Sequence, residues 1–344
     1  MSSEFSDTSD GADHGKPIGS EPLVSVVTPF HNTREFLPEC IESVIKQTYY
    51  NWEYILVDNC SDDGSSEIAA QYARRFPNKI RLFHTESFLS QVQNYNFALT
   101  CISPSSRYCK MVQADDWIFA DCIKGMVEVA EAHPSVGIVA AYELYGSEVR
   151  LDGLPYPSSE VVGHQICRLL FLKDTYLLGT PTSLLMRSEL IRSRNPFYDE
   201  RYAPFEDSHA CLDLLRIWNF GFVHQVLTYS RRDNESIFSR CRDLGLVHLS
   251  VLGGVVVHGR DYLSEAEYRQ CRRRAERAYF LYLSKRALRG SSREFWELHR
   301  KGLASVGYSL DWRLLCKWIP RAVLEKTWDT FWRTWDKAFG LVLE

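Results

Sequence analysis

The stretch Tyr108-Cys109-Lys110-Met111-Val112-Gln113-Ala114-Asp115-Asp116-Trp117 decides how this chain folds. Its apolar first half predicts a short buried strand, and two adjacent carboxylates follow that strand. Ligands of open α/β sheets bind outside the carboxyl ends of the strands, so the acid pair marks a candidate site. Neighbouring carboxylates repel each other unless positive charge lies near them, and a divalent cation carrying a diphosphate would supply it. The alternative is that Asp115 only caps the following helix.

The residues before this stretch alternate between strand-like and helix-like patterns, which predicts parallel βαβ units. The second strand ends in an acid, Asp58. Because crossovers between parallel strands are right-handed, Asp58 and the pair Asp115/Asp116 are expected to open on the same edge of the sheet. The expected strands cover 23–29, 54–58 and 80–83, and the expected helices cover 34–47, 68–76 and 91–99.

The predicted edge lacks a glycine-rich phosphate loop. Neither GxGxxG nor GxxxxGK[ST] occurs in the chain. Phosphates are therefore not expected at a glycine-rich helix N-terminus, and a metal ion, Mg²⁺ or Mn²⁺, is the remaining way to hold them.

The residues after Trp117 continue the α/β pattern as far as residue 240 and are then entirely helical. Three units are expected: a disordered tail over 1–21, an α/β domain over 22–240 and a helical region over 241–344. Within the second unit the pattern predicts a helix over 118–133, a strand over 136–140, a surface loop over 142–163, a strand near 184–186, a helix near 208–218 and a strand over 221–227.

Composition restricts the class of protein. The 344 residues carry a formal net charge of −4, so no overall basic field indicates nucleic acid as a partner. The ten cysteines are scattered singly, and they are expected to be reduced thiols of a cytoplasmic protein. The longest apolar run, 244–257, is too short for a membrane span, although peripheral attachment to the inner face of the membrane stays open.

Six short motifs, in this order and spacing, resemble those of glycosyltransferase family 2, the large family with the GT-A fold. The resemblance covers residues 23 to about 235 and rests on VSVVTPFHN at 24–32, SVIKQTY at 43–49, VDNCSDDGS at 57–65, NFAL at 96–99, QADD at 113–116 and ED at 206–207. It implies an open, mostly parallel GT-A sheet with nucleotide-binding βαβ units and a nucleotide-diphosphate sugar as donor.

The resemblance also implies roles for single residues. Asp115 would bind Mg²⁺ or Mn²⁺ between the two phosphates, and Asp116 would assist the metal or hold sugar hydroxyls. Asp58 would accept a hydrogen bond from the base or ribose, unless it is a turn cap, and Asn96 would contact the donor or tie two loops together. Arg231 and Arg232 could grip phosphate or be solvated loop charges. The residues assigned to donor binding are Thr28, Pro29, Asn32, Asp58, Asn96, Asp115 and Asp116.

Asp207 is the candidate general base of the same resemblance. Removing the acceptor's proton opposite the leaving group would give inversion in a single displacement. The alternative is that Glu206 and Asp207 only cap the following helix, where acids favour the helix dipole. His209 and His224 receive no role.

The chain departs from the family pattern at two positions. Gln113 replaces the first Asp of D-x-D, and Asn59 replaces the second Asp of the loop after the second strand. The Q-x-x-R-W pattern of processive synthases is absent, which favours the transfer of one sugar per encounter.

The function expected from these features is an inverting, metal-dependent glycosyltransferase that moves one sugar to a saccharide or lipid-linked acceptor, in bacterial polysaccharide or glycoconjugate synthesis. Two alternatives stay open: a sugar nucleotidyltransferase, and a non-catalytic module that binds nucleotide sugars. The helical region combines a basic helix with Trp and Phe residues after Pro320. These features suit packing on the catalytic domain, a protein partner or a peripheral membrane contact.

Overall fold

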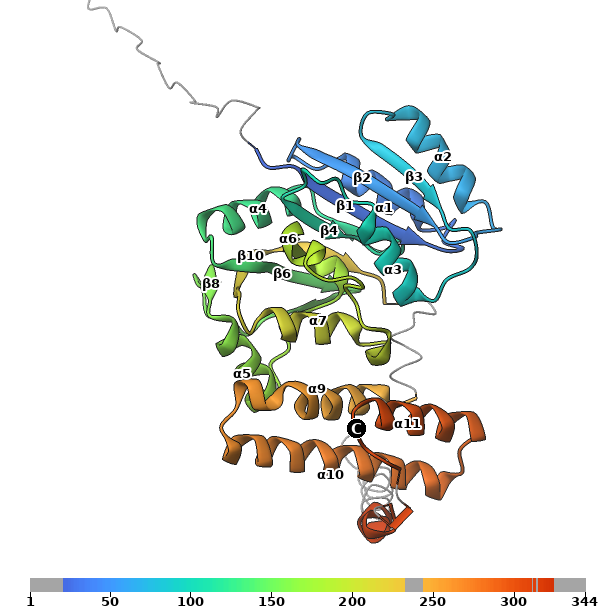
Figure 1. Ribbon diagram of the computed structural model, residues 1–344, viewed down its shortest axis with the longest axis vertical. Coiled ribbons are helices and arrows are strands. Elements are labelled where there is room, and N and C mark those ends of the chain that lie inside the picture. The colour runs from blue at the N-terminus through green and yellow to red at the C-terminus, as the bar shows by residue number, and fades with distance from the viewer. Residues whose placement is uncertain (1–20, 233–243, 311, 314, 325–344) are drawn as a thin grey trace, which may run out of the picture.

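The computed structural model describes residues 21–232, 244–310, 312–313 and 315–324. An α/β unit lies above a layer of three long helices, α9, α10 and α11 (Figure 1). The predicted tail lies outside the described residues except for Glu21, and so does the predicted boundary near residue 240. Both stay predictions.

A single mixed sheet organises the α/β unit. Its strands follow the order β3-β2-β1-β4-β9-β6-β10-β5, with β7 beside β6 and β8 beside β10. The first four strands are mutually parallel, as the βαβ pattern predicts, and β9 then runs antiparallel to both its neighbours. The strands are β1 Val24–Phe30, β2 Trp52–Asp58, β3 Ile80–His84, β4 Tyr108–Met111, β5 Trp117–Ile118, β6 Val136–Tyr145, β7 Glu148–Arg150, β8 Glu160–Val161, β9 Leu184–Arg187 and β10 Asn219–Ser230.

Helices cover both faces of the sheet and create two cores. α1, α2 and α4 pack on one face, where Val24 and Val26 of β1 point. α3, α5 and α7 pack on the other face, where Val27 of β1 points. The helices of the α/β unit are α1 Leu37–Ile45, α2 Ser65–Arg75, α3 Gln91–Thr100, α4 Cys122–Ala132, α5 Gly163–Lys173, α6 Ser188–Arg192 and α7 Glu206–Leu214, with short 3₁₀ turns η1 Pro181–Ser183 and η2 Glu200–Tyr202.

The helical region shares the second core with the α/β unit. Buried residues of α9 Leu246–Tyr262, α10 Glu265–Arg289 and α11 Arg293–Ser305 belong to the same hydrophobic cluster as α5 and α7. The Arg168 guanidinium of α5 also donates to both carboxylate oxygens of Glu267 in α10, at 2.6 and 3.0 Å. The helices after residue 243 therefore cover the α/β unit, which is one of the roles that the sequence left open.

The predicted helix over 118–133 is wrong at its start. Trp117 and Ile118 form the short strand β5, which pairs with Tyr229 and Thr228 of β10, and α4 begins only at Cys122. The backbone N–H of Ile118 donates to Ser43 Oγ at 3.2 Å, so it is not available to a helix. The Trp117 ring stacks on Tyr229 with a centroid distance of 4.8 Å.

The predicted surface loop over 142–163 is wrong at its two ends, whereas residues 151–159 form neither helix nor strand. β6 continues to Tyr145, β7 returns beside it as a hairpin, and β8 pairs with β10. Gly146 supplies the positive φ of +60° that the turn between β6 and β7 requires. The Gly, Pro and Ser residues that predicted one long loop therefore belong to the turns and shorter loops between these strands.

No helix in the described part of the chain is long and apolar enough to cross a membrane. All the described cysteines are free thiols, most of them buried, and Cys60 and Cys316 are exposed.

Candidate active site

The carboxyl ends of β2, β1 and β4 form one edge of the sheet (Figure 1). Asp58 ends β2, Asp115 and Asp116 follow β4, and Phe30 ends β1 between them. The predicted acids of the two strands thus lie on the same edge, because β1 pairs in parallel with both neighbours.

Asp58 lies under the turn that follows β2. Its side chain is buried, one oxygen accepts the backbone N–H of Ser61 at 3.0 Å, and the other lies 3.2 Å from Nδ1 of His84. The turn-cap contact is therefore present. Recognition of a base or ribose by Asp58 stays a prediction. It would use the acceptor positions of the carboxylate that these two contacts do not occupy.

Thr28, Pro29 and Asn32 occupy different depths of the edge. Thr28 is fully buried, and its hydroxyl donates to Val112 O at 2.8 Å, so it ties β1 to β4 beneath the edge. Pro29 is buried within β1, paired with Val57. Asn32 is exposed and exchanges two hydrogen bonds with Asp62, at 2.8 and 3.0 Å. Of the three, only Asn32 presents its side chain at the surface.

Asp116 is turned inward. It is 5% exposed, and its carboxylate accepts from Thr182 Oγ1 at 2.7 Å, from Ser230 Oγ at 3.2 Å and from the backbone N–H of Arg231 at 3.2 Å. Burial, and then the charge of Asp115, raises the pKa of Asp116 to about 8. A carboxylate with three internal donors is placed to fix the loop after β4 and is poorly placed to hold a metal ion.

A buried polar network supports this loop from below. Glu143 of β6 accepts from Ser183 Oγ at 2.9 Å and from Ser230 Oγ at 2.7 Å, and Ser230 also reaches Asp116. The fully buried Lys110 of β4 donates to the carbonyls of Thr182 and Leu184. Four strands are therefore cross-linked under Asp116, which restricts the position of its neighbour Asp115.

Asp115 is half-buried at the edge, and its backbone carbonyl accepts from Arg231 Nε at 3.2 Å. Gln113 points away toward α3, where its amide donates to the hydroxyl of Tyr95 at 2.9 Å. Arg231 is bound to Glu39 at 2.5 Å, and Arg232 is bound to Glu148 at 2.8 Å. Both arginines therefore hold the loop together in this structure.

Tyr95 joins the two acid groups of the site. It is buried, and burial followed by the charges of Glu206 and Asp115 raises its pKa far above the ordinary value. Because the charges of both acids reach one phenol, and Gln113 donates to its hydroxyl, the loop after β4 and the N-terminus of α7 both lie near Tyr95. The sequence offered no signal for Tyr95, which lies in the middle of a helical pattern.

Glu206 and Asp207 begin α7. Asp207 accepts the N–H of Ser208 at 2.7 Å, but the N-cap position of α7 is Phe205 and no side chain caps the helix. Burial raises the pKa of Asp207 to about 6, and burial with the charge of Asp207 raises that of Glu206 to about 7. Glu206 is 4% exposed, and its Oε2 has no hydrogen-bond partner among the described residues. A helix cap alone does not explain two acids with raised pKa values side by side.

Asn96 ties α3 to the segment that leads into α7. Its amide donates to Tyr198 O and its carbonyl accepts from Tyr198 N, both at 2.8 Å. Of the two roles that the sequence left open for Asn96, the tie between two loops is the one present in this structure.

Asn96→Ala should therefore lower the free energy of unfolding by about 2 kcal/mol, since two partly buried hydrogen bonds at about 1 kcal/mol each are lost. Urea denaturation measures this loss. Asn78→Ala, an exposed turn position, is the control and should change stability little. If Asn96→Ala instead keeps its stability and loses donor affinity, Asn96 is a donor ligand.

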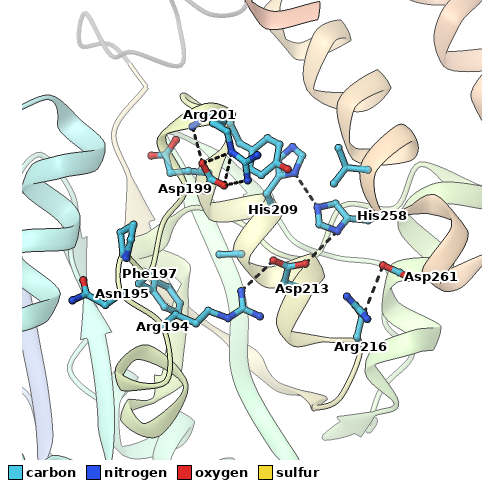
Figure 2. Close-up of a pocket in the computed structure, with 15 residues that line it drawn as sticks. Arg194, Asn195, Phe197, Asp199, Arg201, His209, Asp213, Arg216, His258 and Asp261 are labelled. Carbon is cyan, nitrogen blue, oxygen red and sulfur yellow. Dashed lines mark hydrogen bonds and ion pairs between the residues drawn. The ribbon is translucent and has the colours of Figure 1, made fainter. Parts of the chain in front are cut away.

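A cavity of about 480 Å³ lies between the segment 194–202, α7 and α9 (Figure 2). Nδ1 of His209 in α7 lies 2.9 Å from Nε2 of His258 in α9, and Nδ1 of His258 lies 3.5 Å from Asp213. The ring of Tyr202 stacks flat on His209. Burial lowers the pKa of His209 to about 3, so the pair is neutral at pH 7 and forms a polar contact between the α/β unit and the helical region.

A second cavity, of about 440 Å³, lies at the acidic edge beside Asn32 and Phe36.

The residues at this edge could hold a metal ion only if a bound substrate supplied further coordinating atoms. The described residues hold no cluster of three or more His, Cys, Asp or Glu able to bind a metal ion. Asp116 and Gln113 are engaged internally, whereas Asp115 is half-buried at the edge. Mg²⁺ is commonly bound by one or two carboxylates together with substrate phosphates, and one carboxylate on an open edge suits that arrangement.

Comparison with known proteins gives the class first. The architecture is that of the GT-A glycosyltransferases: S. aureus TarS in complex with UDP matches with a TM-score of 0.58, 17% identity, and coverage of 83% of this chain and 80% of TarS. A mannosyltransferase from Pyrobaculum calidifontis, in complex with GDP-Man and Mn²⁺, matches with a TM-score of 0.52, 16% identity, and coverage of 92% and 90%.

Sequence comparison then gives the family. The model of glycosyl transferase family 2 matches residues 25–195. Glycosyltransferase GlyG of Streptococcus pneumoniae is 32% identical over 257 residues, which cover 70% of this chain and 82% of GlyG. TuaG of Bacillus subtilis, named for teichuronic acid biosynthesis, is 34% identical over 220 residues, 64% of this chain and 82% of TuaG. The chain belongs to glycosyltransferase family 2 and is a glycosyltransferase, as the six motifs predict; the nucleotidyltransferase and the non-catalytic module are set aside.

Proposed function

We propose that this enzyme transfers one sugar, with inversion, from a nucleotide-diphosphate sugar to a saccharide or lipid-linked acceptor in bacterial polysaccharide or glycoconjugate synthesis. The observation that carries the proposal is that both acid groups lie near Tyr95, whose hydroxyl accepts from Gln113 of the Asp115 loop and is acted on by the charges of Glu206 and Asp115. The names of the relatives support the pathway class, and the neighbours bound to UDP and GDP-Man support the donor class.

The donor is assigned to the acidic edge. Asn32 and the turn after Asp58 would flank the nucleotide, beside the cavity of about 440 Å³. Asp115 would hold a Mg²⁺ or Mn²⁺ ion together with the diphosphate. The metal supplies Lewis-acid stabilisation of the charge that develops on the leaving diphosphate. Asp116, held by Thr182 and Ser230, keeps the Asp115 loop in place.

Asp207 is assigned the role of general base, which removes the proton of the acceptor hydroxyl. A carboxylate on the acceptor side takes that proton as the new bond forms at the anomeric carbon, and attack opposite the leaving group inverts the configuration. A pKa of about 6 leaves Asp207 mostly ionised at pH 7 while keeping it more basic than an ordinary aspartate. Glu206, with the higher pKa, would be protonated more often than Asp207 and would not compete for the same role.

The proposal is tested by incubating the enzyme with a panel of nucleotide sugars, with and without Mn²⁺, and identifying the products. Metal-dependent release of nucleoside diphosphate, increased by saccharide or lipid-linked acceptors, is expected. The anomeric coupling constant of the product, measured by NMR, should show inversion. Retention of configuration, or turnover unaffected by chelation of metal, would contradict the corresponding part of the proposal.

The pH dependence of turnover gives a separate prediction. A general base works only when deprotonated, so kcat/KM should fall as the pH is lowered through the folded-state pKa of Asp207, about 6. Glu206→Gln is the matched variant, because Gln resembles the protonated form in which Glu206 stands when Asp207 titrates. It should leave the midpoint near 6. A wild-type midpoint near 4, the ordinary value for an aspartate, would contradict the assignment of the buried Asp207, with its raised pKa, as the general base.

A further inference from the structure

The helical region differs sharply in charge from the rest of the chain. Residues 244–324 contain 15 Lys and Arg against 7 Asp and Glu, a formal net charge of +8. Since the whole chain carries −4, all other residues together carry −12. Such an asymmetry makes the molecule an electric dipole whose positive end is the helical layer, and it indicates an anionic partner for that end.

The positive charge is displayed on the outer face of α10. The face that α10 buries is marked by Tyr268, Cys271, Ala275 and Tyr279. Arg269, Arg273 and Arg277 recur at every fourth residue and are all exposed. At 100° per residue, these three side chains lie roughly 120–200° around the helix from Ala275, which is the side away from the core. Glu265 lies 3.8 Å from Arg269, an exposed pair too weak to mask the charge.

The chain after α11 extends this basic face. Tyr308 donates to Glu276 of α10 at 2.5 Å, and Ser284 of α10 donates to the carbonyl of the buried Leu315 at 3.1 Å. Tyr308 and Leu315 therefore lie against α10. Trp312 between them is 55% exposed, with its ring centroid 5.3 Å from that of Trp296 in α11, and Lys317 after them is exposed.

We propose that this face, the basic face of Arg269, Arg273, Arg277, Trp312 and Lys317, docks on an anionic phospholipid bilayer. Basic side chains near a negatively charged leaflet are each worth about a factor of five in affinity. An exposed tryptophan in the same helical region suits the headgroup level, where an amphipathic ring has both of its preferred environments. A folded protein with an acidic patch would also be attracted to the arginines. Its acidic surface would not, however, offer a favourable environment to the exposed indole of Trp312.

The position of α10 in the fold fits this partner. α9 packs against α5 and α7, and α10 packs against α9 on the side away from the sheet (Figure 1). Docking through α10 would thus leave the acidic edge uncovered. It would also keep the negatively charged unit at least a helix layer away from the bilayer, about 10 Å, which exceeds the Debye length of about 8 Å at physiological salt. The docking does not depend on the sugar transfer proposed above, and its test needs no donor.

The test is flotation of the full chain with vesicles of phosphatidylcholine alone and of phosphatidylcholine with 30% phosphatidylglycerol. Binding to the anionic vesicles only, weakened by 500 mM NaCl, is expected. Replacement of Arg269, Arg273 and Arg277 by Gln should weaken it by about 100-fold, from three factors of five. The matched control replaces Lys46, Arg74 and Arg75, exposed on α1 and α2, by Gln with the same change of net charge, and should stay near wild type.

Thermal unfolding of both triple variants confirms that they are folded, and Trp312→Ala gives a second, single-site measurement that should also weaken binding. The proposal is overturned if wild type does not bind anionic vesicles, if salt has no effect, or if the α10 variant and its control bind equally. Binding of an acidic protein with no affinity for either kind of vesicle would also overturn it.

Discussion

Asp115→Ala should abolish turnover and also the thermal stabilisation that a nucleoside diphosphate gives in the presence of Mn²⁺. Asp115 is half-buried at the acidic edge and is the acid to which the family resemblance assigns the metal ion, whereas Asp116 is held inward by Thr182, Ser230 and Arg231. Metal stabilisation of a leaving diphosphate is worth several kcal/mol, so a loss of at least about 1,000-fold in kcat is expected.

Two measurements separate this effect from misfolding. The unliganded variant should melt close to wild type, and the shift produced by nucleoside diphosphate with Mn²⁺ should vanish, since a ligand stabilises only the state that it binds. Gln113→Ala is the control next to Asp115. Its amide donates to Tyr95 and not toward the edge, so nucleotide and metal should bind nearly as in wild type. Wild-type metal and nucleotide binding by Asp115→Ala would show that the ion is held elsewhere.

The βαβ half of the fold could be predicted because its signals are local. β1, β2 and β4 are short β-branched or apolar runs, and each is followed by a polar turn. Hydrophobic periodicity and turn residues determine such segments independently of the rest of the chain. The right-handed crossover then placed Asp58 and Asp115 on one edge without any further information.

The predictions that failed concern residues whose backbone or side chain pairs with a distant segment of the chain. Trp117 and Ile118 carry a helical pattern, yet β10, more than 100 residues later, takes them into the sheet. The role of Asp116 was hidden for the same reason. Its partners Thr182 and Ser230 lie 66 and 114 residues away, and neither stands in a recognisable motif. A motif identifies which acids belong to a site, whereas burial and hydrogen bonding decide which of them face the ligand.

Histidines illustrate the same limit. His209 and His258 are 49 residues apart, and each is unremarkable in its own helix. Only the packing of α9 on α7 turns them into a buried pair with a lowered pKa, beside the acids that begin α7. No local pattern could have indicated this contact, because it depends on how the helical region covers the catalytic unit.

Asp207→Asn tests the residue on which the mechanism depends most. Asn keeps the size of the side chain and can still accept the N–H of Ser208, so a cap at this position would survive the change. It cannot accept the acceptor's proton. The variant should therefore fold, melt near wild type and bind donor with metal normally, while turnover falls by roughly 10²- to 10⁴-fold, the usual contribution of a positioned base.

Glu206→Gln is the matched control for this loss, because it alters the neighbouring acid at the same helix N-terminus. Glu206 is buried and has the higher pKa of the two, so a neutral Gln resembles the form it takes at moderately acidic pH. Glu206 is assigned no proton transfer, so turnover should fall much less than in Asp207→Asn. Turnover should be measured with the true acceptor, since slow donor hydrolysis by water does not require the same proton transfer. If Asp207→Asn retains wild-type transfer to that acceptor, another group takes the proton, and α7 contributes only its position.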